Sequence, residues 1–193
     1  QYIQEYFNGH IFAAYGCSLG GSFVSLLVNR ENIHIDHAII GSSDMDQTSK
    51  FLAKLQTTLV IPIIYPLITG KESRLAKKFI SKRMNIQDEN ADYRKKFMEL
   101  MGIGSGIDFS FISKESMKNQ FCSDLYTKVG QQIQVPHTTI HVFYAKKMGE
   151  KYRKRYAKYF KQPDIIEFDL RHEELLLDAS RWVKEVCKAC QII

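Results

Sequence analysis

Residues 16–20 spell Gly-Cys-Ser-Leu-Gly, a Gly-x-Ser-x-Gly pattern, and they are the group in this sequence best suited to chemistry. An apolar run precedes the serine, and an amphipathic run follows it. A strand that turns sharply into a helix lifts the intervening serine hydroxyl onto an exposed corner, and flanking glycines leave room for that turn. The pattern predicts that Ser18 is a nucleophile. The alternative is an ordinary glycine-rich turn in which Ser18 caps the following helix.

A serine nucleophile needs a base, normally histidine, to accept its proton. In a parallel α/β sheet the reacting groups gather beyond the carboxyl ends of the strands, and this criterion separates the six histidines. Only His172 directly follows a predicted strand. The others lie at or before a strand start (His10, His34 and His137) or within a strand (His37 and His141). We therefore expect His172 to be the base; the alternative is a surface histidine near the start of the last helix.

The histidine in turn needs a carboxylate that fixes its tautomer. Two turns satisfy the same criterion: one follows the second predicted strand and contains Asp44 and Asp46, and the other follows the third and contains Glu150. Both turns lie between Ser18 and His172, which gives the chain order serine, acid, histidine. The residues alone leave the choice of acid open. For Asp44 the alternative is a helix N-cap.

Strand and helix patterns alternate along much of the chain, which predicts an α/β fold with a parallel sheet flanked by helices. The predicted strands span residues 11–15, 33–42, 138–145 and 164–170. The predicted helices between the second and third strands span residues 51–59, 73–84, 91–101 and 114–129. A helical insertion at this place predicts a cap over the strand ends. We therefore expect a core of residues 1–43 and 131–193, with a cap of residues 44–130.

Composition and charge exclude several classes of protein. The chain has 193 residues, of which 45% are hydrophobic, as in globular domains. Pro62 and Pro66 interrupt its most apolar run, so we expect no stable membrane insertion. No secretion signal is visible, and the four cysteines are scattered, so we expect a cytoplasmic protein. The CxxC of Cys187 and Cys190 lacks partners for a zinc site.

The net charge of +6 comes mostly from residues 146–161, where Glu150 is the single acid. Tyr152, Tyr156 and Tyr159 recur there at helical spacing, which predicts an amphipathic helix with an aromatic inner face and a solvated basic outer face. We therefore expect no nucleic-acid partner.

Taken together, GCSLGG after an apolar strand, the helical insertion, and LRHEELL after the last strand resemble the C-terminal half to two-thirds of an α/β-hydrolase of the serine esterase and lipase type. The resemblance covers essentially the whole chain. It implies that Ser18 is the nucleophile, that His172 is the general base, and that the backbone N–H of Leu19 is an oxyanion-hole donor. The family usually carries its acid near the position of Met148, where this sequence departs from the pattern. The acid is then Glu150, two residues further on, or Asp44 after the preceding strand; we favour Asp44, and Asp46 ranks third.

A second departure concerns the start of the chain. α/β-Hydrolases begin with further strands, and a loop among them supplies the second oxyanion donor; the first residue here is Gln1 rather than Met. We therefore expect the N-terminal strands to lie outside this numbering.

The expected function is a serine hydrolase that cleaves a small-molecule carboxylic ester, with a hydrophobic acyl group, through an acyl-enzyme intermediate. The resemblance implies no metal and no organic cofactor. The alternative is a non-catalytic α/β-hydrolase-like protein that binds a ligand or partner, and the missing acid at Met148 keeps it open.

Overall fold

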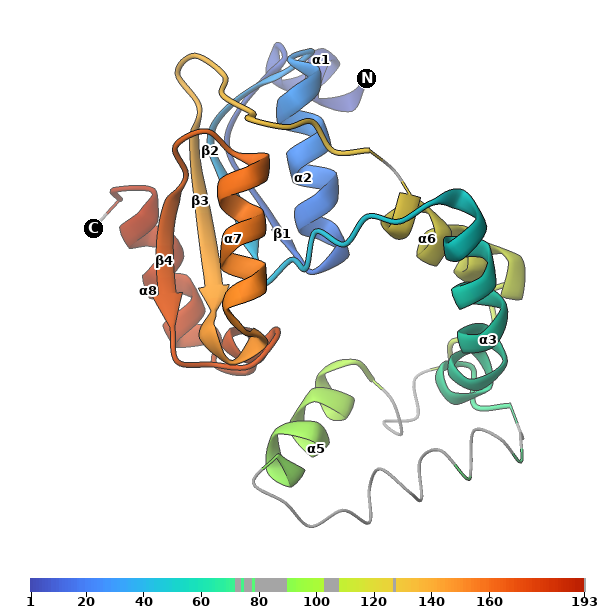
Figure 1. The fold of residues 1–193 in the computed structure, drawn as a ribbon. Coiled ribbons are helices and arrows are strands. Elements are labelled where there is room, and N and C mark those ends of the chain that lie inside the picture. The colour runs from blue at the N-terminus through green and yellow to red at the C-terminus, as the bar shows by residue number, and fades with distance from the viewer. Residues whose placement is uncertain (72–73, 75–77, 79–89, 103–107, 127, 193) are drawn as a thin grey trace. The chain divides into compact units, whose positions relative to one another are not determined.

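The computed structural model describes residues 1–71, 74, 78, 90–102, 108–126 and 128–192 (Figure 1). The chain divides into two compact units. The first, which we call the sheet unit, joins Gln1–Met45 to Lys128–Ile193, and the second, the helical unit, is Asp46–Thr127. Ser18, Asp44, Glu150 and His172 therefore all belong to the sheet unit.

Within the described residues, the sheet unit is built on four parallel strands that neighbour one another in chain order. The strands are β1 (His10–Cys17), β2 (His34–Gly41), β3 (Thr139–Ala145) and β4 (Asp164–Phe168). The helices are α1 (Tyr2–Phe7), α2 (Leu19–Arg30), α7 (Glu150–Tyr159) and α8 (Ala179–Ala189), with short 3-10 turns η1 (Lys146–Met148) and η2 (Glu174–Leu177). The predicted α/β fold with a parallel sheet flanked by helices is confirmed.

Two hydrophobic clusters cover the two faces of this sheet. On one face, Val28 of α2 and Tyr156 of α7 pack with Ile40 and Val142 of the central strands. On the other face, Trp182 of α8 packs with a group that includes Phe143. Figure 1 shows the same layers, with α2 and α7 on one side of the sheet and α8 on the other. Because both faces are covered, the second half of β2, residues 38–41, and β3 from Ile140 onwards are buried.

Two details of burial differ from expectation. The run of residues 11–15 is apolar enough for a fully buried strand, but β1 lies at one edge of the described sheet and Phe12 is 49% exposed. Phe23 of α2 fits an inward stripe by spacing, yet it is 47% exposed, whereas Val24 and Val28 are buried. Helix α2 packs through a narrower apolar stripe than its spacing suggests, because its buried positions include small residues and a Cβ on Gly21 would already lie 3.0 Å from Ile40 of β2.

The helical unit contains α3 (Lys50–Ile68), α5 (Ala91–Leu100) and α6 (Lys114–Tyr126) in its described part. A buried stripe on α3, formed by Ala53, Thr57 and Ile61, recurs every four residues, and Thr57 Oγ1 lies 3.4 Å from Cys122 Sγ of α6. The two helices therefore pack along their length. The helix predicted over residues 73–84 lies largely outside the described residues, and the capping role of this unit stays a prediction.

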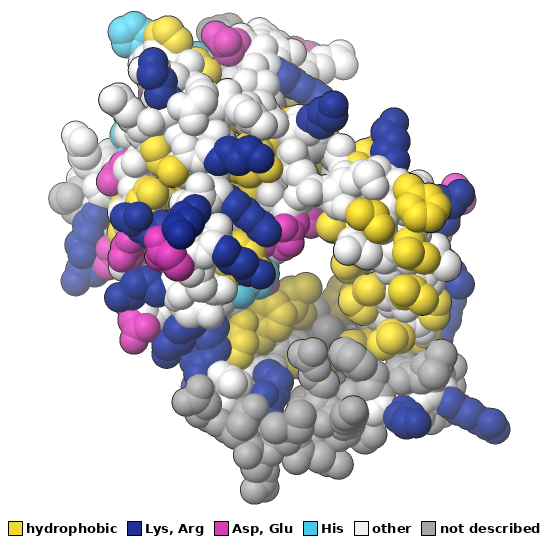
Figure 2. Space-filling model, viewed as in Figure 1, with side chains coloured by type: hydrophobic (Ala, Val, Ile, Leu, Met, Phe, Trp, Pro, Cys, Tyr) yellow, Lys and Arg dark blue, Asp and Glu magenta, His cyan; other side chains and the backbone are white. Residues whose placement is uncertain are grey.

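Helix α3 is longer than the sequence suggests. Pro62 and Pro66 were expected to interrupt the apolar run, but both lie inside one continuous helix of 19 residues. By length and composition alone, α3 could cross a membrane, a property that core helices of globular domains share. Figure 2 shows hydrophobic side chains gathered over this helix pair, and Phe51 and Leu59 are among the most exposed. That the chain makes no stable membrane insertion stays a prediction.

Helix α7 has the two faces that its spacing predicts. Tyr156 and Tyr159 are buried in the core, and Tyr152 packs against it. Lysines and arginines cover the outer side, where Figure 2 shows them interspersed with acidic side chains. One such pair joins Arg153 Nε to Glu167 Oε1 at 2.7 Å. The basic run is therefore a solvated helix face; the absence of a nucleic-acid partner stays a prediction.

Candidate active site

Ser18 occupies a strained corner between β1 and α2. Its backbone has φ 53° and ψ −121°, a combination that side chains with a Cβ rarely adopt, and its N–H donates to the carbonyl of Gly41 at 2.8 Å. Although Ser18 stands at the N-cap position of α2, its side chain makes no capping hydrogen bond. The alternative of an ordinary capping serine is therefore wrong. The backbone holds the Ser18 hydroxyl at a strand-to-helix corner without using it for the helix.

The glycines around Ser18 have different roles from those that the pattern suggests. A Cβ on Gly16 would lie 2.1 Å from the carbonyl oxygen of Gly20, so only glycine fits there. A Cβ on Gly20 itself would meet nothing within 4 Å. The second constrained position is Gly21, where a Cβ would lie 2.7 Å from Cβ of Ser43. The turn thus depends on Gly16 for its tightness and on Gly21 for the close packing of α2 against the residues after β2.

Leu19 is the first residue of α2. The first N–H groups of a helix have no acceptor within the helix and carry the positive end of its dipole. The backbone N–H of Leu19, directly after Ser18, is therefore suited to stabilise a negative oxygen that forms next to the Ser18 hydroxyl.

The carboxyl ends of all four strands meet the loop after β4 around a small pocket. Cys17 Sγ lies 3.9 Å from Glu173 Oε1, and the N–H of Lys147 donates to the carbonyl of Leu170 at 3.1 Å. The pocket is lined by Tyr15, Cys17, Gly41, Ser42, Phe143, Ala145, Phe168, Leu170, Arg171, Glu173, Leu175 and Leu176. The residues next to Ser18 and on both sides of His172 are therefore part of one site, although the two lie more than 150 positions apart in the chain.

His172 lies in the loop that follows β4, as the sequence predicts, and the other histidines also lie at their expected places along the strands. Its side chain is 39% exposed, and Nδ1 lies 3.9 Å from Glu173 Oε2. Arg171, the preceding residue, is held in place by Glu174, whose Oε2 accepts from the Arg171 N–H at 2.6 Å. The loop is thus anchored on both sides of His172 while the imidazole keeps access to solvent.

The three carboxylates proposed as acid have different surroundings. The turn that carries Asp44 is fastened to α7, because the Asp44 carbonyl accepts from Arg155 at 2.7 Å, and the Asp44 charge helps to raise the pKa of buried Tyr156. Asp46 falls in the helical unit. Glu150 is exposed at the start of α7, where its charge acts on Tyr144 and Arg153.

The alternative role for Asp44, a helix N-cap, is wrong. Helix α3 begins at Lys50, and its N-cap is Ser49, whose hydroxyl accepts from the N–H of Leu52 at 3.3 Å. The N-cap role therefore belongs to Ser49 and not to Asp44.

Glu173 is the functional candidate that sequence reasoning missed. Its side chain is only 15% exposed, and its carboxylate lies 3.9 Å from both Cys17 Sγ and His172 Nδ1. In the sequence it reads as one of two acids that suit the start of a helix, but Glu173 has φ 61° and precedes a 3-10 turn instead. The sequence signal that could have identified Glu173 is its position directly after His172, the candidate base.

Burial and charge keep the neighbouring groups of Ser18 protonated. Burial, and then the nearby Glu173 carboxylate, raise the pKa of Cys17 to about 12. Burial also raises the pKa of Tyr15 above its ordinary value. Because a thiol with so high a pKa is uncharged and weakly nucleophilic at neutral pH, Cys17 does not compete with Ser18 for an electrophile.

No protein-family profile matches the sequence, and no curated protein matches it significantly. Solved structures do match. An alpha/beta hydrolase family protein from Desulfitobacterium hafniense superposes with a TM-score of 0.60 and 15% identity, over 97% of this chain and 71% of that one. A marine microorganism esterase superposes with a TM-score of 0.56 and 12% identity, over 91% of this chain and 69% of that one. The chain therefore has the α/β-hydrolase fold.

Proposed function

We propose that this protein is a serine hydrolase that cleaves carboxylic esters through an acyl-enzyme intermediate. The observation that carries the proposal is the backbone of Ser18, which is held at φ 53° and ψ −121° while its hydroxyl caps nothing. Strain of this kind is costly and persists where function requires it. The match to an esterase supports the same chemistry through the fold alone.

In this proposal Ser18 Oγ attacks the ester carbonyl while His172 accepts the hydroxyl proton. The carbonyl oxygen becomes an oxyanion, which the N–H of Leu19 at the start of α2 stabilises. The tetrahedral intermediate expels the alcohol, which takes its proton from His172, and an acyl group remains on Ser18. Water, activated by His172, then attacks the acyl-enzyme and releases the carboxylic acid and Ser18.

Asp44 remains the favoured acid. Its turn is anchored by the Arg155 hydrogen bond to the Asp44 carbonyl, whereas Glu150 is exposed and its charge acts on Arg153 of α7. The structure adds Glu173 as a further candidate, because its carboxylate lies 3.9 Å from His172 Nδ1. As the neighbour of His172 in the chain, Glu173 is better placed to fix the loop than to orient the ring.

The proposal is tested with a fluorophosphonate probe, which phosphonylates an activated serine. We expect one adduct, located on Ser18 by peptide mass spectrometry, and none in Ser18→Ala or His172→Gln. The control is Ser180→Ala, an exposed serine of α8, which should label at the wild-type rate. A folded protein without an adduct on Ser18 would overturn the proposal and leave the non-catalytic ligand-binding alternative.

The acid is identified by three matched carboxylate-to-amide variants, Asp44→Asn, Glu150→Gln and Glu173→Gln. Loss of the orienting carboxylate should slow labelling by more than about a hundredfold, because the imidazole then adopts the wrong tautomer. We expect this loss only in Asp44→Asn. An equal loss in Glu150→Gln, with Asp44→Asn unaffected, would transfer the role to Glu150.

A hydrophobic acyl group and a cytoplasmic location remain predictions. The first is tested with p-nitrophenyl esters of increasing acyl length, for which kcat/KM should rise from acetate to octanoate. The second rests on the sequence alone.

A further inference from the structure

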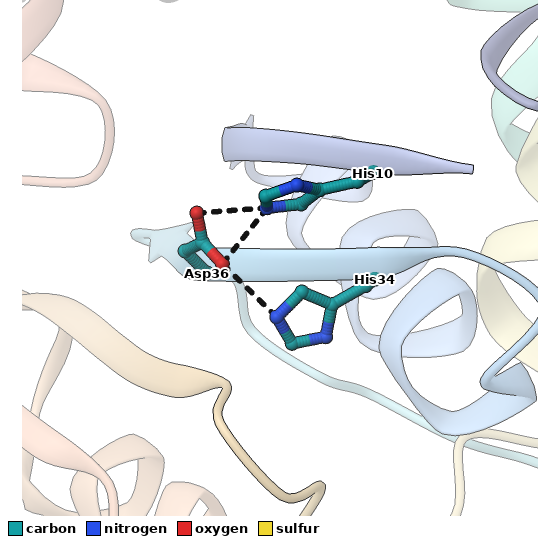
Figure 3. A group of neighbouring side chains, drawn as sticks. All are labelled: His10, His34 and Asp36. Atoms are coloured by element: carbon teal, nitrogen blue, oxygen red, sulfur yellow. Dashed lines mark hydrogen bonds and ion pairs between the residues drawn. The ribbon is translucent and has the colours of Figure 1, made fainter. Parts of the chain in front are cut away.

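A second cluster of chemically capable side chains lies at the opposite end of the sheet from Ser18. His10 and His34 are the first residues of β1 and β2 and are register partners, so their side chains lie next to each other (Figure 3). Asp36 follows His34 by two positions in β2 and projects to the same side. Figure 3 shows all three side chains converging on one point in front of the two strands.

We propose that His10, His34 and Asp36 form a binding site for a divalent transition-metal ion of the zinc type. His10 Nε2 lies 2.9 Å from Asp36 Oδ2, and His34 Nε2 lies 3.0 Å from Asp36 Oδ1. All ligand atoms lie within 4.8 Å of one another. Ligands at zinc–ligand distances of about 2.0–2.1 Å lie about 3.3 Å apart in tetrahedral geometry. The two nitrogen–oxygen distances therefore need to open by only a few tenths of an ångström, and side-chain rotation brings the two imidazole nitrogens to the same spacing.

The donor set selects the class of ion. Two imidazoles and one carboxylate suit zinc, cobalt and nickel, whereas magnesium and calcium prefer sites made of oxygen. For a metal to bind, each imidazole carries its proton on Nδ1 and directs the Nε2 lone pair towards the ion. The side chains of His10, His34 and Asp36 are 54%, 37% and 33% exposed, so an ion can enter, and water can complete its coordination.

The backbone already brings the ligands together. Asn8 and Gly9 both have positive φ and end α1 in a tight turn directly before His10. The N–H of His34 then donates to the carbonyl of Gly9 at 2.7 Å, which ties the beginnings of β1 and β2. Since β1 has eight residues, the site lies about 25 Å from Ser18. The bound ion would therefore clamp the two strands and take no part in the ester chemistry.

The test is a zinc chloride titration of the untagged full chain by calorimetry. We expect one zinc ion per chain, and binding at least about tenfold weaker in His10→Ala and in His34→Ala, which each remove one ligand. His137→Asn is the matched control, because His137 is exposed, lies outside the cluster, and has a positive φ that asparagine tolerates. It should bind zinc as the wild type does, and magnesium chloride should give no binding to any variant.

Two further measurements separate this site from others in the chain. Cobalt bound by cysteine shows an intense thiolate-to-cobalt charge-transfer band, which should be absent here. Zinc should raise the Tm of the wild type and not that of His34→Ala, while fluorophosphonate labelling of Ser18 changes less than about twofold. Zinc binding that survives in both histidine variants, or a thiolate band, would overturn the proposal. If His34→Ala fails to fold, the more exposed His10→Ala decides.

Discussion

The strain at Ser18 predicts that glycine at this position stabilises the protein while it abolishes activity. A residue with a Cβ in this backbone region costs about 1–3 kcal/mol, and glycine removes that cost. Glycine also gives the unfolded chain more freedom, which costs about 0.5–1 kcal/mol relative to alanine. Ser18→Gly should therefore be more stable than Ser18→Ala by about 0.5–2 kcal/mol. Both variants lack the hydroxyl, so the comparison isolates the backbone.

The assay is urea unfolding followed by the fluorescence of Trp182, the single tryptophan of the chain, which lies in the same unit as Ser18. In thermal unfolding of the same variants, a difference of 1 kcal/mol would appear as about 2–4 °C in Tm for a chain of this size. The matched pair is Ser180→Gly and Ser180→Ala in helix α8, where glycine should be the less stable variant by about 0.5–1 kcal/mol. If Ser18→Gly is no more stable than Ser18→Ala, the serine is not strained and the reasoning for a nucleophile turn fails.

Three further predictions follow from the same region and from the sheet. Gly21→Ala should lower the free energy of unfolding by about 1–3 kcal/mol, because the new Cβ meets Ser43, whereas Gly20→Ala should cost nothing; urea unfolding compares them. Burial, and then the neighbouring His141, lower the pKa of His37, so the unfolded state binds this proton more tightly and stability should fall as the pH drops through about 6.5. His37→Asn should weaken that dependence in unfolding curves between pH 5 and 7.5, and an unchanged slope would exclude His37 as its source. Iodoacetamide should alkylate Cys17 more slowly than Cys187 at pH 8, as peptide mass spectrometry would show, because partial burial and then the Glu173 carboxylate raise the Cys17 pKa to about 12; equal rates would contradict a protonated Cys17 thiol.

The order of strands and helices could be predicted because it depends on local periodicity and turn residues. The burial of individual side chains could not be predicted in this way, since it depends on the order of the strands in the sheet. The run of residues 11–15 is apolar, but nothing in it tells whether β1 lies in the centre of the sheet or at an edge. Similarly, Pro62 and Pro66 predict a helix break from local rules, yet the stripe of Ala53, Thr57 and Ile61 packs against α6 and α3 stays continuous.

At the candidate site, position along the strands predicts Ser18 and His172 but leaves the acid open, and all of these roles stay predictions. Residues after the carboxyl end of a strand share one edge of a parallel sheet, and Ser18 after β1 and His172 after β4 both lie at that edge. Two turns at that edge carry carboxylates, and the choice between them depends on side-chain direction, which has no periodic signal. Glu173 has no sequence signal for a related reason: the sequence suggests the first turn of a helix there, whereas its φ of 61° places it before a 3-10 turn.

The criterion that favours His172, a position directly after a strand, gives no information about residues at the amino ends of the strands. His10 and His34 start strands, so they lie at the wrong edge of the sheet to serve a serine nucleophile. Twenty-four positions separate them, and no motif spacing connects them; their proximity follows from the register of β1 and β2, which pairs His10 with His34. A parallel sheet brings the first residues of its strands together at one edge and the residues that follow the strands together at the other. Ester cleavage is proposed at the carboxyl ends of the strands, and metal binding at their amino ends.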